Sequence, residues 1–240
     1  MTQLHASQPE TIRKMFSAIS GRYDLANSVL SLGIHHLWRK KLVQWSGATS
    51  SQKVLDCASG TGDLAFEFEK KVGPSGEVVA TDFCEDMLKH GEKKSLARKS
   101  AVKFQVADVM NLPFPDSYFD IGSIAFGIRN VSNPSQGLSE MARVTRPGGI
   151  IMVLEFGQTQ IPVWKEFYQF YSSKVLPKIG GALTGKSDAY NYLQDSSLKF
   201  PCGEKFLDLV RLTGKFDSIH AKPLMGGVAY LYQLRRRVES

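Results

Sequence analysis

The sequence predicts an α/β fold: a doubly wound, mostly parallel seven-stranded sheet with an antiparallel edge strand and a helical segment ahead of it. Two observations support this prediction. Short apolar runs alternate with amphipathic helical segments through most of the 240 residues, which is typical of a parallel sheet with helices on both faces. A glycine-rich turn also follows the first apolar run, as it does after the first strand of doubly wound sheets. Right-handed crossovers restrict the topology to such forms.

The elements follow one another in a regular order. The front segment, Thr11–Trp45, is expected to be mostly helical, with interruptions near Gly21 and Gly33. Strands are expected at Lys53–Cys57, Glu77–Thr81, Val102–Val106, Phe119–Phe126, Ile150–Phe156, Phe216–Ala221 and Val228–Leu234, the last two as an antiparallel edge. Helices are expected at Asp63–Val72, Glu85–Arg98, Ser135–Val144 and Glu204–Leu212, with a turn at Arg146–Gly149 and a polar stretch at Thr184–Asp195.

Composition excludes several classes of protein. Hydrophobic residues make up 42% and charged residues 22%, a globular balance that excludes disordered and fibrous chains. Apolar stretches such as Ile150–Leu154 are far shorter than the roughly 20 residues that span a bilayer, and the start, MTQLHASQPE, lacks the apolar core of a signal peptide. The widely spaced Cys57, Cys84 and Cys202 indicate neither a disulfide framework nor a metal site. We therefore expect a cytoplasmic protein.

The formal charge of +7 raises the question of a nucleic-acid or membrane partner. Basic residues are concentrated in only two places, Lys89–Lys103 and the tail Arg235–Arg237. A solvated helix face and a solubilising tail are the simpler interpretations of these segments. Weak attraction to an anionic lipid surface is the functional alternative.

The first glycine-rich turn indicates a nucleotide-like ligand. The run from Gly60 to Ala65 matches GxGxxG/A, and Asp82 lies twenty residues after Gly62. A dinucleotide would also fit this pattern. Asp56, four positions before Gly60, distinguishes a dinucleotide from a cationic ligand. Its carboxylate would repel a pyrophosphate but attract an ammonium and a sulfonium. S-adenosylmethionine carries both cations, so it is the favoured ligand.

Acidic residues follow three consecutive strands and complete the expected cofactor site. Asp82 is suited to accept both ribose hydroxyls, and Asp108 to accept from the adenine amino group. Gly60 and Gly62 permit close approach of the backbone, and Thr61 supplies a hydroxyl. Each acid has an alternative role: Asp56 or Asp108 as a helix cap, and Asp82 as a turn residue. Their joint arrangement favours cofactor binding.

Two long segments resemble family signatures. They are YDLANSVLSLGIHHLWR from Tyr23 to Arg39 and RVTRPGGIIMVLEF from Arg143 to Phe156; AFGIRNV from Ala125 and GGVA from Gly226 add to the match. With its glycine-rich turn the chain resembles the class I S-adenosylmethionine methyltransferases, which have a Rossmann-like fold. More narrowly, from Ile12 to Leu231 it resembles the quinone-biosynthesis C-methyltransferases of the UbiE/MenG type.

This resemblance implies transfer of a methyl group to a ring carbon of a prenylated quinol, either a demethylmenaquinol or a methoxy-benzoquinol. It places the family's cofactor contacts on Thr61, Asp82, Asp108, Val109 and Ala125. Ala125 departs from the serine that is usual in this family, so a side-chain hydroxyl contact is lost there, although a backbone contact remains feasible.

The chemistry requires the quinol ring to be oriented and made electron-rich. Arg129, a permanent cation with a planar fork, is suited to face a phenolate, and Asn130 to orient it or bind the second ring oxygen. Tyr23, Asp24 and His35 are the candidate proton acceptors, directly or through water. Each residue also has a structural alternative. Arg129 could form an ion pair, His35 could simply flank a helix, and Tyr23 could be an aromatic residue of the core.

We expect one domain over residues 1–240. Residues 1–45 form a helical segment over the site, called here the N-terminal cover; residues 46–160 form the cofactor-binding core; and residues 161–240 supply substrate-side helices and closing strands. An apolar stripe in the last part is either core or a wall for the isoprenoid tail; it comprises Trp164, Phe167, Tyr168, Tyr171 and Val175. The second interpretation, with the positive charge, predicts peripheral contact with the inner face of the membrane.

Two rival functions are weaker. A methyltransferase acting on RNA fits the positive net charge. However, the segment Ile124–Arg129 lacks the Asn/Asp-Pro-Pro-aromatic run that is used to methylate base amino groups, and the sequence shows no RNA-binding module. We therefore expect no nucleic-acid partner. A binding protein or assembly scaffold without chemistry is the other rival, because fold never establishes activity. The retention of Arg129 and Asn130 argues against it. The sequence gives no indication of the oligomeric state.

Overall fold

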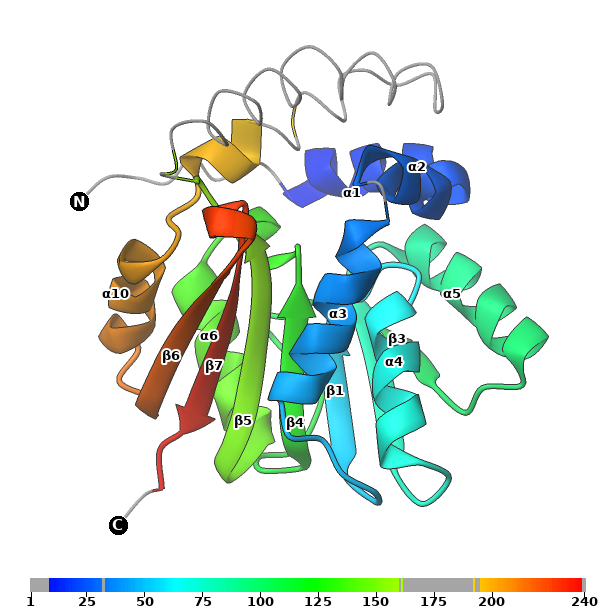
Figure 1. Ribbon diagram of the computed structural model, residues 1–240. Helices are drawn as coiled ribbons and strands as arrows, with labels where there is room; N and C mark the ends of the chain where they lie inside the picture. The colour runs from blue at the N-terminus through cyan, green and yellow to red at the C-terminus, as the bar shows by residue number, and fades with distance from the viewer. Residues whose placement is uncertain (1–8, 32, 160, 162–191, 193–194, 239–240) are drawn as a thin grey trace.

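The computed structural model describes residues 9–31, 33–159, 161, 192 and 195–238. Among these residues, seven strands form one sheet in the order β3-β2-β1-β4-β5-β7-β6 (Figure 1). β7 pairs antiparallel with β5 and β6, and the other pairs are parallel. This confirms the predicted fold class. The strands are β1 Lys53–Cys57, β2 Glu77–Asp82, β3 Lys103–Val106, β4 Phe119–Ala125, β5 Thr145–Phe156, β6 Phe216–Leu224 and β7 Ala229–Arg236.

The helices surround the sheet (Figure 1). α3 and α4 pack on one face and α6 and α10 on the other, while α1 and α2 lie across the carboxyl ends of the strands. α5 packs beside β2 and β3. Of the helices in the described residues, none has the length and apolar character needed to cross a membrane. Their bounds are α1 Pro9–Ile19, α2 Tyr23–Leu30, α3 Ile34–Trp45, α4 Asp63–Val72, α5 Glu85–Arg98, α6 Pro134–Val144 and α10 Glu204–Leu212.

The predicted elements agree closely with the observed ones, with one exception. The predicted bounds of α4, α5 and α10 are confirmed at both ends. The predicted turn Arg146–Gly149 is wrong as a separate element, because β5 already begins at Thr145. Thr145 pairs with Phe119 and Ile150 with Ile121, so the residues between them bulge out of the ladder. The apolar stripe at 164–175 and most of the polar stretch at 184–195 lie outside the described residues.

The two faces of the sheet carry separate apolar clusters, as the two-residue period of β1 requires. Leu55 and Cys57 pack with α6 and α10, whereas Val54 packs with α3 and α4. Asp56 therefore shares the face of Val54, where it is 1% exposed. A carboxylate in this layer is desolvated from both sides, which sets its electrostatic behaviour.

α5 approaches β3 unusually closely, because it has no side chain at Gly91. A Cβ at Gly91 would lie 2.4 Å from Cε1 of Phe104, and a Cβ at Gly62 would lie 2.8 Å from the same ring. The Phe104 ring thus separates α5 from the turn that precedes α4. This packing places α5 beside the turn that follows β1, where Lys94 Nζ donates to Thr61 Oγ1.

We predict that Gly91→Ala destabilises the protein by about 1–3 kcal/mol, because overpacking Phe104 outweighs the helix propensity gained. The matched control is Gly137→Ala in α6, where a Cβ meets Val109 at an ordinary 3.4 Å. That variant is expected to be neutral or stabilised by up to about 1 kcal/mol. Chemical unfolding of both variants measures the difference, and equal stabilities would contradict the close packing of α5.

Candidate active site

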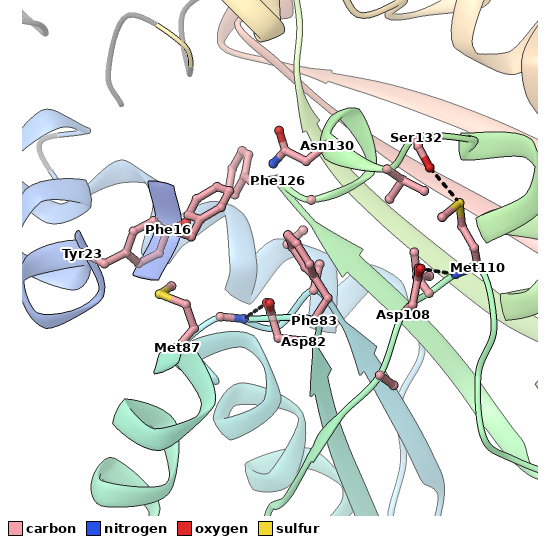
Figure 2. Close-up of a pocket in the computed structure, with 17 residues that line it drawn as sticks. Phe16, Tyr23, Asp82, Phe83, Met87, Asp108, Met110, Phe126, Asn130 and Ser132 are labelled. Atoms are coloured by element: carbon pink, nitrogen blue, oxygen red, sulfur yellow. Dashed lines mark hydrogen bonds between the residues drawn. The ribbon is translucent and has the colours of Figure 1, made fainter. Parts of the chain in front are cut away.

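A cavity lies at the carboxyl ends of β1, β2, β3 and β4, where open parallel sheets bind their ligands. Figure 2 shows Phe16, Tyr23 and Met87 toward one side of it, and Asp108, Met110 and Ser132 toward the other. Asp82 and Phe83 lie between the two groups. Helices α1 and α2 of the N-terminal cover supply Phe16 and Tyr23 to the lining of the cavity.

The turn at residues 58–62, called here the glycine loop, shapes the cavity at β1. Gly60 and Gly62 adopt left-handed conformations, with φ of 58° and 82°. A Cβ at Gly60 would lie 3.2 Å from Cε of Met87 and 3.9 Å from Cε1 of Tyr23. Gly60 therefore allows the loop to lie close to both α5 and the cover, and it lines the cavity. Gly62 faces Phe104 instead.

Asp82 is a buried carboxylate at the centre of the site. Its Oδ2 accepts a hydrogen bond from the Gly60 amide at 2.9 Å (Figure 2). Its Oδ1 accepts one from the Cys84 amide at 2.9 Å. Burial raises its pKa to about 6, against these hydrogen bonds, which favour the charged form. Each carboxylate oxygen has a second lone pair, so Asp82 can still accept from two hydroxyls of a ligand.

Asp56 lies behind the glycine loop and does not line the cavity. Its Oδ1 accepts from the Ser123 hydroxyl at 2.7 Å. Burial raises its pKa to about 7 in spite of that bond. Within the described part of the chain, Asp56 Oδ2 and Ser59 Oγ are buried and have no hydrogen-bond partner. Two such atoms beside one loop leave polar capacity for a ligand or its water.

The other predicted cofactor residues that line the cavity are Asp108, Val109 and Ala125. Asp108 is exposed, and its Oδ1 accepts from the Met110 amide at 2.9 Å. Val109 is buried and Ala125 is half-buried at the end of β4. Thr61, in contrast, is buried outside the lining residues.

Arg129 lies in a buried ion pair and does not face the cavity. Its Nη1 is 2.6 Å from Glu155 Oε1, and both side chains are 2% exposed. The same nitrogen donates to the Phe126 carbonyl at 2.7 Å, and Nε donates to Ser196. This geometry matches the structural alternative for Arg129 and not a guanidinium aimed at a bound ring. The pair instead fastens the segment between β4 and α6.

Asn130 and Tyr23 are the predicted catalytic residues that do line the cavity. Asn130 Oδ1 accepts from the Tyr192 hydroxyl at 3.2 Å. The Tyr23 ring meets Phe16 edge-on, with centroids 6.0 Å apart. The two polar side chains therefore lie in aromatic surroundings, which suits a flat ligand with polar substituents.

Asp24 and His35 lie outside the lining residues. Asp24 accepts from the Thr61 hydroxyl at 2.6 Å and from Lys94 at 2.9 Å. His35 is buried with its Nδ1 2.5 Å from Ser31 Oγ, and burial lowers its pKa to about 4. The ring is therefore neutral at physiological pH. The structure does not bring either group to the wall of the cavity.

Several residues that line the cavity were not predicted from the sequence. Phe83 and Phe126 directly follow β2 and β4, so the rule that ligands bind at strand ends would have identified them. Phe16 and Met87 belong to an apolar cluster that joins α1 to α5. Such contacts depend on the docking of two helices, and no local sequence signal reveals them.

Comparison with known proteins identifies the family of this chain. A model described as the ubiE/COQ5 methyltransferase family matches residues 1–234. The chain belongs to this family. The ubiquinone/menaquinone biosynthesis C-methyltransferase UbiE of Bdellovibrio bacteriovorus is 55% identical over 229 residues, 95% of this chain and 97% of the relative. The protein of the same name from Roseobacter denitrificans is 41% identical over 223 residues, 92% and 88% of the two chains.

Solved structures share the fold of this ubiE/COQ5 family member at lower identity. A SAM-dependent methyltransferase from Aquifex aeolicus has a TM-score of 0.61 at 18% identity, over 82% of this chain and 89% of that one. A SAM-dependent methyltransferase from Thermotoga maritima, a possible histamine N-methyltransferase, has a TM-score of 0.65 at 16% identity, over 94% and 100%. These structures show that the chain shares their fold, and its family and relatives show that it is a methyltransferase. The buried Asp82 and the unpartnered Asp56 Oδ2 fit a cationic nucleoside such as S-adenosylmethionine.

We predict that the affinity for S-adenosylhomocysteine falls as the pH is lowered from 8 to 5. Asp82 and Asp56 have pKa values raised to about 6 and about 7, so both become neutral in this range. Loss of a charge-assisted hydrogen bond costs about 1.5–3 kcal/mol, so we expect roughly a tenfold rise in Kd or more. Calorimetry at each pH measures it.

Single variants separate the two carboxylates. Asp82→Asn should lose the part of the pH dependence near 6 and Asp56→Asn the part near 7. Asp116→Asn is the control, because its carboxyl is 71% exposed and pairs with Arg143 far from the cavity. A Kd that stays constant from pH 5 to 8 in the native protein would contradict the assignment.

We predict that Arg129→Leu lowers the free energy of unfolding by about 3–5 kcal/mol, because it leaves the Glu155 carboxylate buried without its cation. The double variant Arg129→Leu/Glu155→Leu should recover much of that loss. Urea unfolding checks both. If the single variant keeps its stability but loses turnover, Arg129 has a catalytic role at the reacting ring and not a structural one.

Proposed function

We propose that this ubiE/COQ5 family member methylates a ring carbon of a prenylated quinol, a demethylmenaquinol or a methoxy-benzoquinol. The observation that carries the proposal is that two kinds of side chain line one cavity. The carboxylates Asp82 and Asp108 are called here its acidic part, and Phe16, Phe126 and Asn130 its aromatic part. The first part suits a nucleoside donor, and the second suits a flat acceptor ring. The relatives named for ubiquinone and menaquinone biosynthesis support this choice of acceptor.

The donor is assigned to the acidic part by the chemistry of each group. Asp82 accepts from the ribose hydroxyls and Asp108 from the adenine amino group, with Val109 and Ala125 against the base. Asp56 acts from behind the glycine loop, where its negative charge favours the cationic methionine end without direct contact at the cavity wall. The bound donor supplies an electrophilic methyl group with a neutral thioether as leaving group.

The acceptor ring is oriented by neutral polar groups. Asn130, from the segment after β4, and Tyr23, from α2, both line the cavity, and each is assigned to hydrogen-bond one of the two ring oxygens. A free phenol has a pKa of about 10, and each unit by which the site lowers it contributes about 1.4 kcal/mol toward the reactive phenolate. Two oriented donors in an apolar cavity provide such a shift. Phe16 and Phe126 exclude water from the ring.

Methylation releases one proton from the quinol, from the ring hydroxyl or from the methylated ring carbon. This proton leaves at the side of the cavity formed by Tyr23. Of the three acceptors considered from sequence, Tyr23 alone lines the cavity. Both oxygens of Asp24 already accept hydrogen bonds from Thr61 and Lys94. His35 is a neutral base, but its Nδ1 is engaged by Ser31. A water bound at the Tyr23 hydroxyl is therefore the proposed carrier of the proton.

Peripheral contact with the inner face of the membrane gives access to the prenyl tail. Leu25 on α2 and Leu37 on α3 are 56% and 58% exposed, and Lys40 and Lys41 are exposed on the same cover. Apolar side chains beside positive charge favour an anionic bilayer surface. Sedimentation with phosphatidylglycerol vesicles tests this: binding should be reversed by salt, and none should occur with neutral vesicles.

The decisive experiment is a labelled methyl-transfer assay with a reduced prenylated naphthoquinol, a reduced benzoquinol and bulk transfer RNA. We predict product with at least one quinol and none with RNA. Asn130→Leu should lower kcat by about 100-fold, the usual effect of one oriented donor, while its Kd for S-adenosylhomocysteine stays within about threefold. Gln105→Leu on the exposed edge strand β3 is the control. Methylation of RNA alone would refute the proposal.

A further inference from the structure

Lys94 of α5 joins the N-terminal cover to the glycine loop. Its Nζ lies 2.5 Å from Asp63 Oδ1, 2.9 Å from Asp24 Oδ2 and 3.0 Å from Thr61 Oγ1. An ammonium has three donors, and here each has an acceptor. The three acceptors come from α2, the glycine loop and the first turn of α4. One cation therefore holds three separate elements in place.

This cluster differs from an ordinary surface ion pair. The Lys94 side chain is 22% exposed, and its partners Asp63 and Asp24 are 15% and 39% exposed. Lys89, on the same helix, is 53% exposed in its pairs with two acidic residues. Partial burial strengthens an ion pair because solvent screens it less. Arg39 of α3 adds a second cation 3.0 Å from Asp63, so four charges balance in one place.

The backbone of α5 explains how Lys94 reaches this point. Lys94 follows Gly91 by three residues and Met87 by seven, so the three share one helix face. Met87 lines the cavity and Gly91 lies against Phe104. The same face therefore passes from the cavity wall to the ionic cluster. The sequence suggests only a solvated basic helix here, because the run Lys89–Lys103 hides which lysine turns inward.

Next to this ionic cluster, His35 and His36 lie close to Asp63, but the three residues are poorly suited to bind a metal ion. Ligand atoms of these three residues lie within 4.8 Å of one another. The Asp63 carboxylate is already held by Lys94 and Arg39, and these two positive charges would repel a further cation. The charges are therefore arranged to hold protein elements together.

The position of the cluster connects it to the donor site. Asp24 directly follows Tyr23, which lines the cavity, and Thr61 lies between Gly60 and Gly62. The Thr61 hydroxyl donates to Asp24 Oδ1 at 2.6 Å, so the loop and the cover also bind each other. When these contacts break, α2 loses its ionic attachment to the loop on which the donor rests.

We propose that Lys94 is a positioning residue that locks the N-terminal cover onto the glycine loop, and that this lock retains the methyl donor and its product in the cavity. The inference rests on donor binding in this cavity and does not depend on which quinol is methylated. Phe16 and Tyr23 are carried by the cover, so the donor leaves when they move aside. Breaking the lock speeds that movement.

The test is the rate at which S-adenosylhomocysteine leaves the full-length protein, measured by stopped-flow displacement. We expect Lys94→Met to accelerate dissociation and raise Kd by about 10- to 100-fold, as loss of one partner of a partly buried charge pair does. Lys94→Arg, which keeps the charge, should restore part of the affinity. Lys89→Met is the matched control, since it removes an exposed ion pair from the same helix, and it should leave both constants unchanged.

A double-variant cycle distinguishes a lock from general destabilisation. Asp24→Asn alone should accelerate dissociation, and adding it to Lys94→Met should cause little further change, because both break the same contact. Thermal unfolding of each variant shows whether the fold is kept; if Lys94→Met does not fold, Asp24→Asn and Lys94→Arg carry the test. Native protein that fails to bind S-adenosylhomocysteine would overturn the donor site itself. Native binding with unchanged constants in the Lys94 and Asp24 variants would overturn only the lock.

Discussion

The hydrogen bond from the Gly60 amide to the Asp82 carboxylate is the contact on which the site depends. It joins the end of β2 to the glycine loop after β1, and so fixes the loop where α4 begins. Gly60 has no side chain to keep Met87 and Tyr23 away, so α5 and the cover can close over the loop. One buried carboxylate thereby sets the position of the loop, and the loop sets the position of the cover. The desolvation that raises the Asp82 pKa follows from this enclosure.

The sequence predicted the features that depend on local pattern. Three helices have the predicted bounds because apolar spacing and a terminating glycine or basic turn are local signals. The place of Asp82 in the cavity follows from its spacing behind the glycine-rich turn, which is set by one strand-helix-strand unit. The bulge in β5 was missed because it depends on pairing with β4, which a single-sequence pattern does not contain.

Features that depend on tertiary contact were harder to predict. Asp56 shares the face of Val54 in a two-residue repeat, so its burial under α4 could have been inferred from the strand itself. The partners of Arg129 and Lys94 could not, because Glu155 is 26 residues away and Asp24 is 70 residues away in the chain. A long cationic side chain reaches a solvent face, a ligand or a carboxylate equally well, and only the folded arrangement decides among them.

The charged and neutral groups of the site have different tasks. Arg129 pairs with Glu155 and donates a hydrogen bond to the Phe126 carbonyl. These contacts stabilise the segment that ends at Asn130. Phe126 needs such support, because its φ of 57° is a strained conformation for a residue with a side chain. A permanent cation facing the ring would attract the phenolate, but it would also repel the sulfonium of the methyl donor. Neutral hydrogen-bond donors avoid this conflict: in the proposed reaction Asn130 would stabilise the developing oxyanion without repelling the cationic methyl donor.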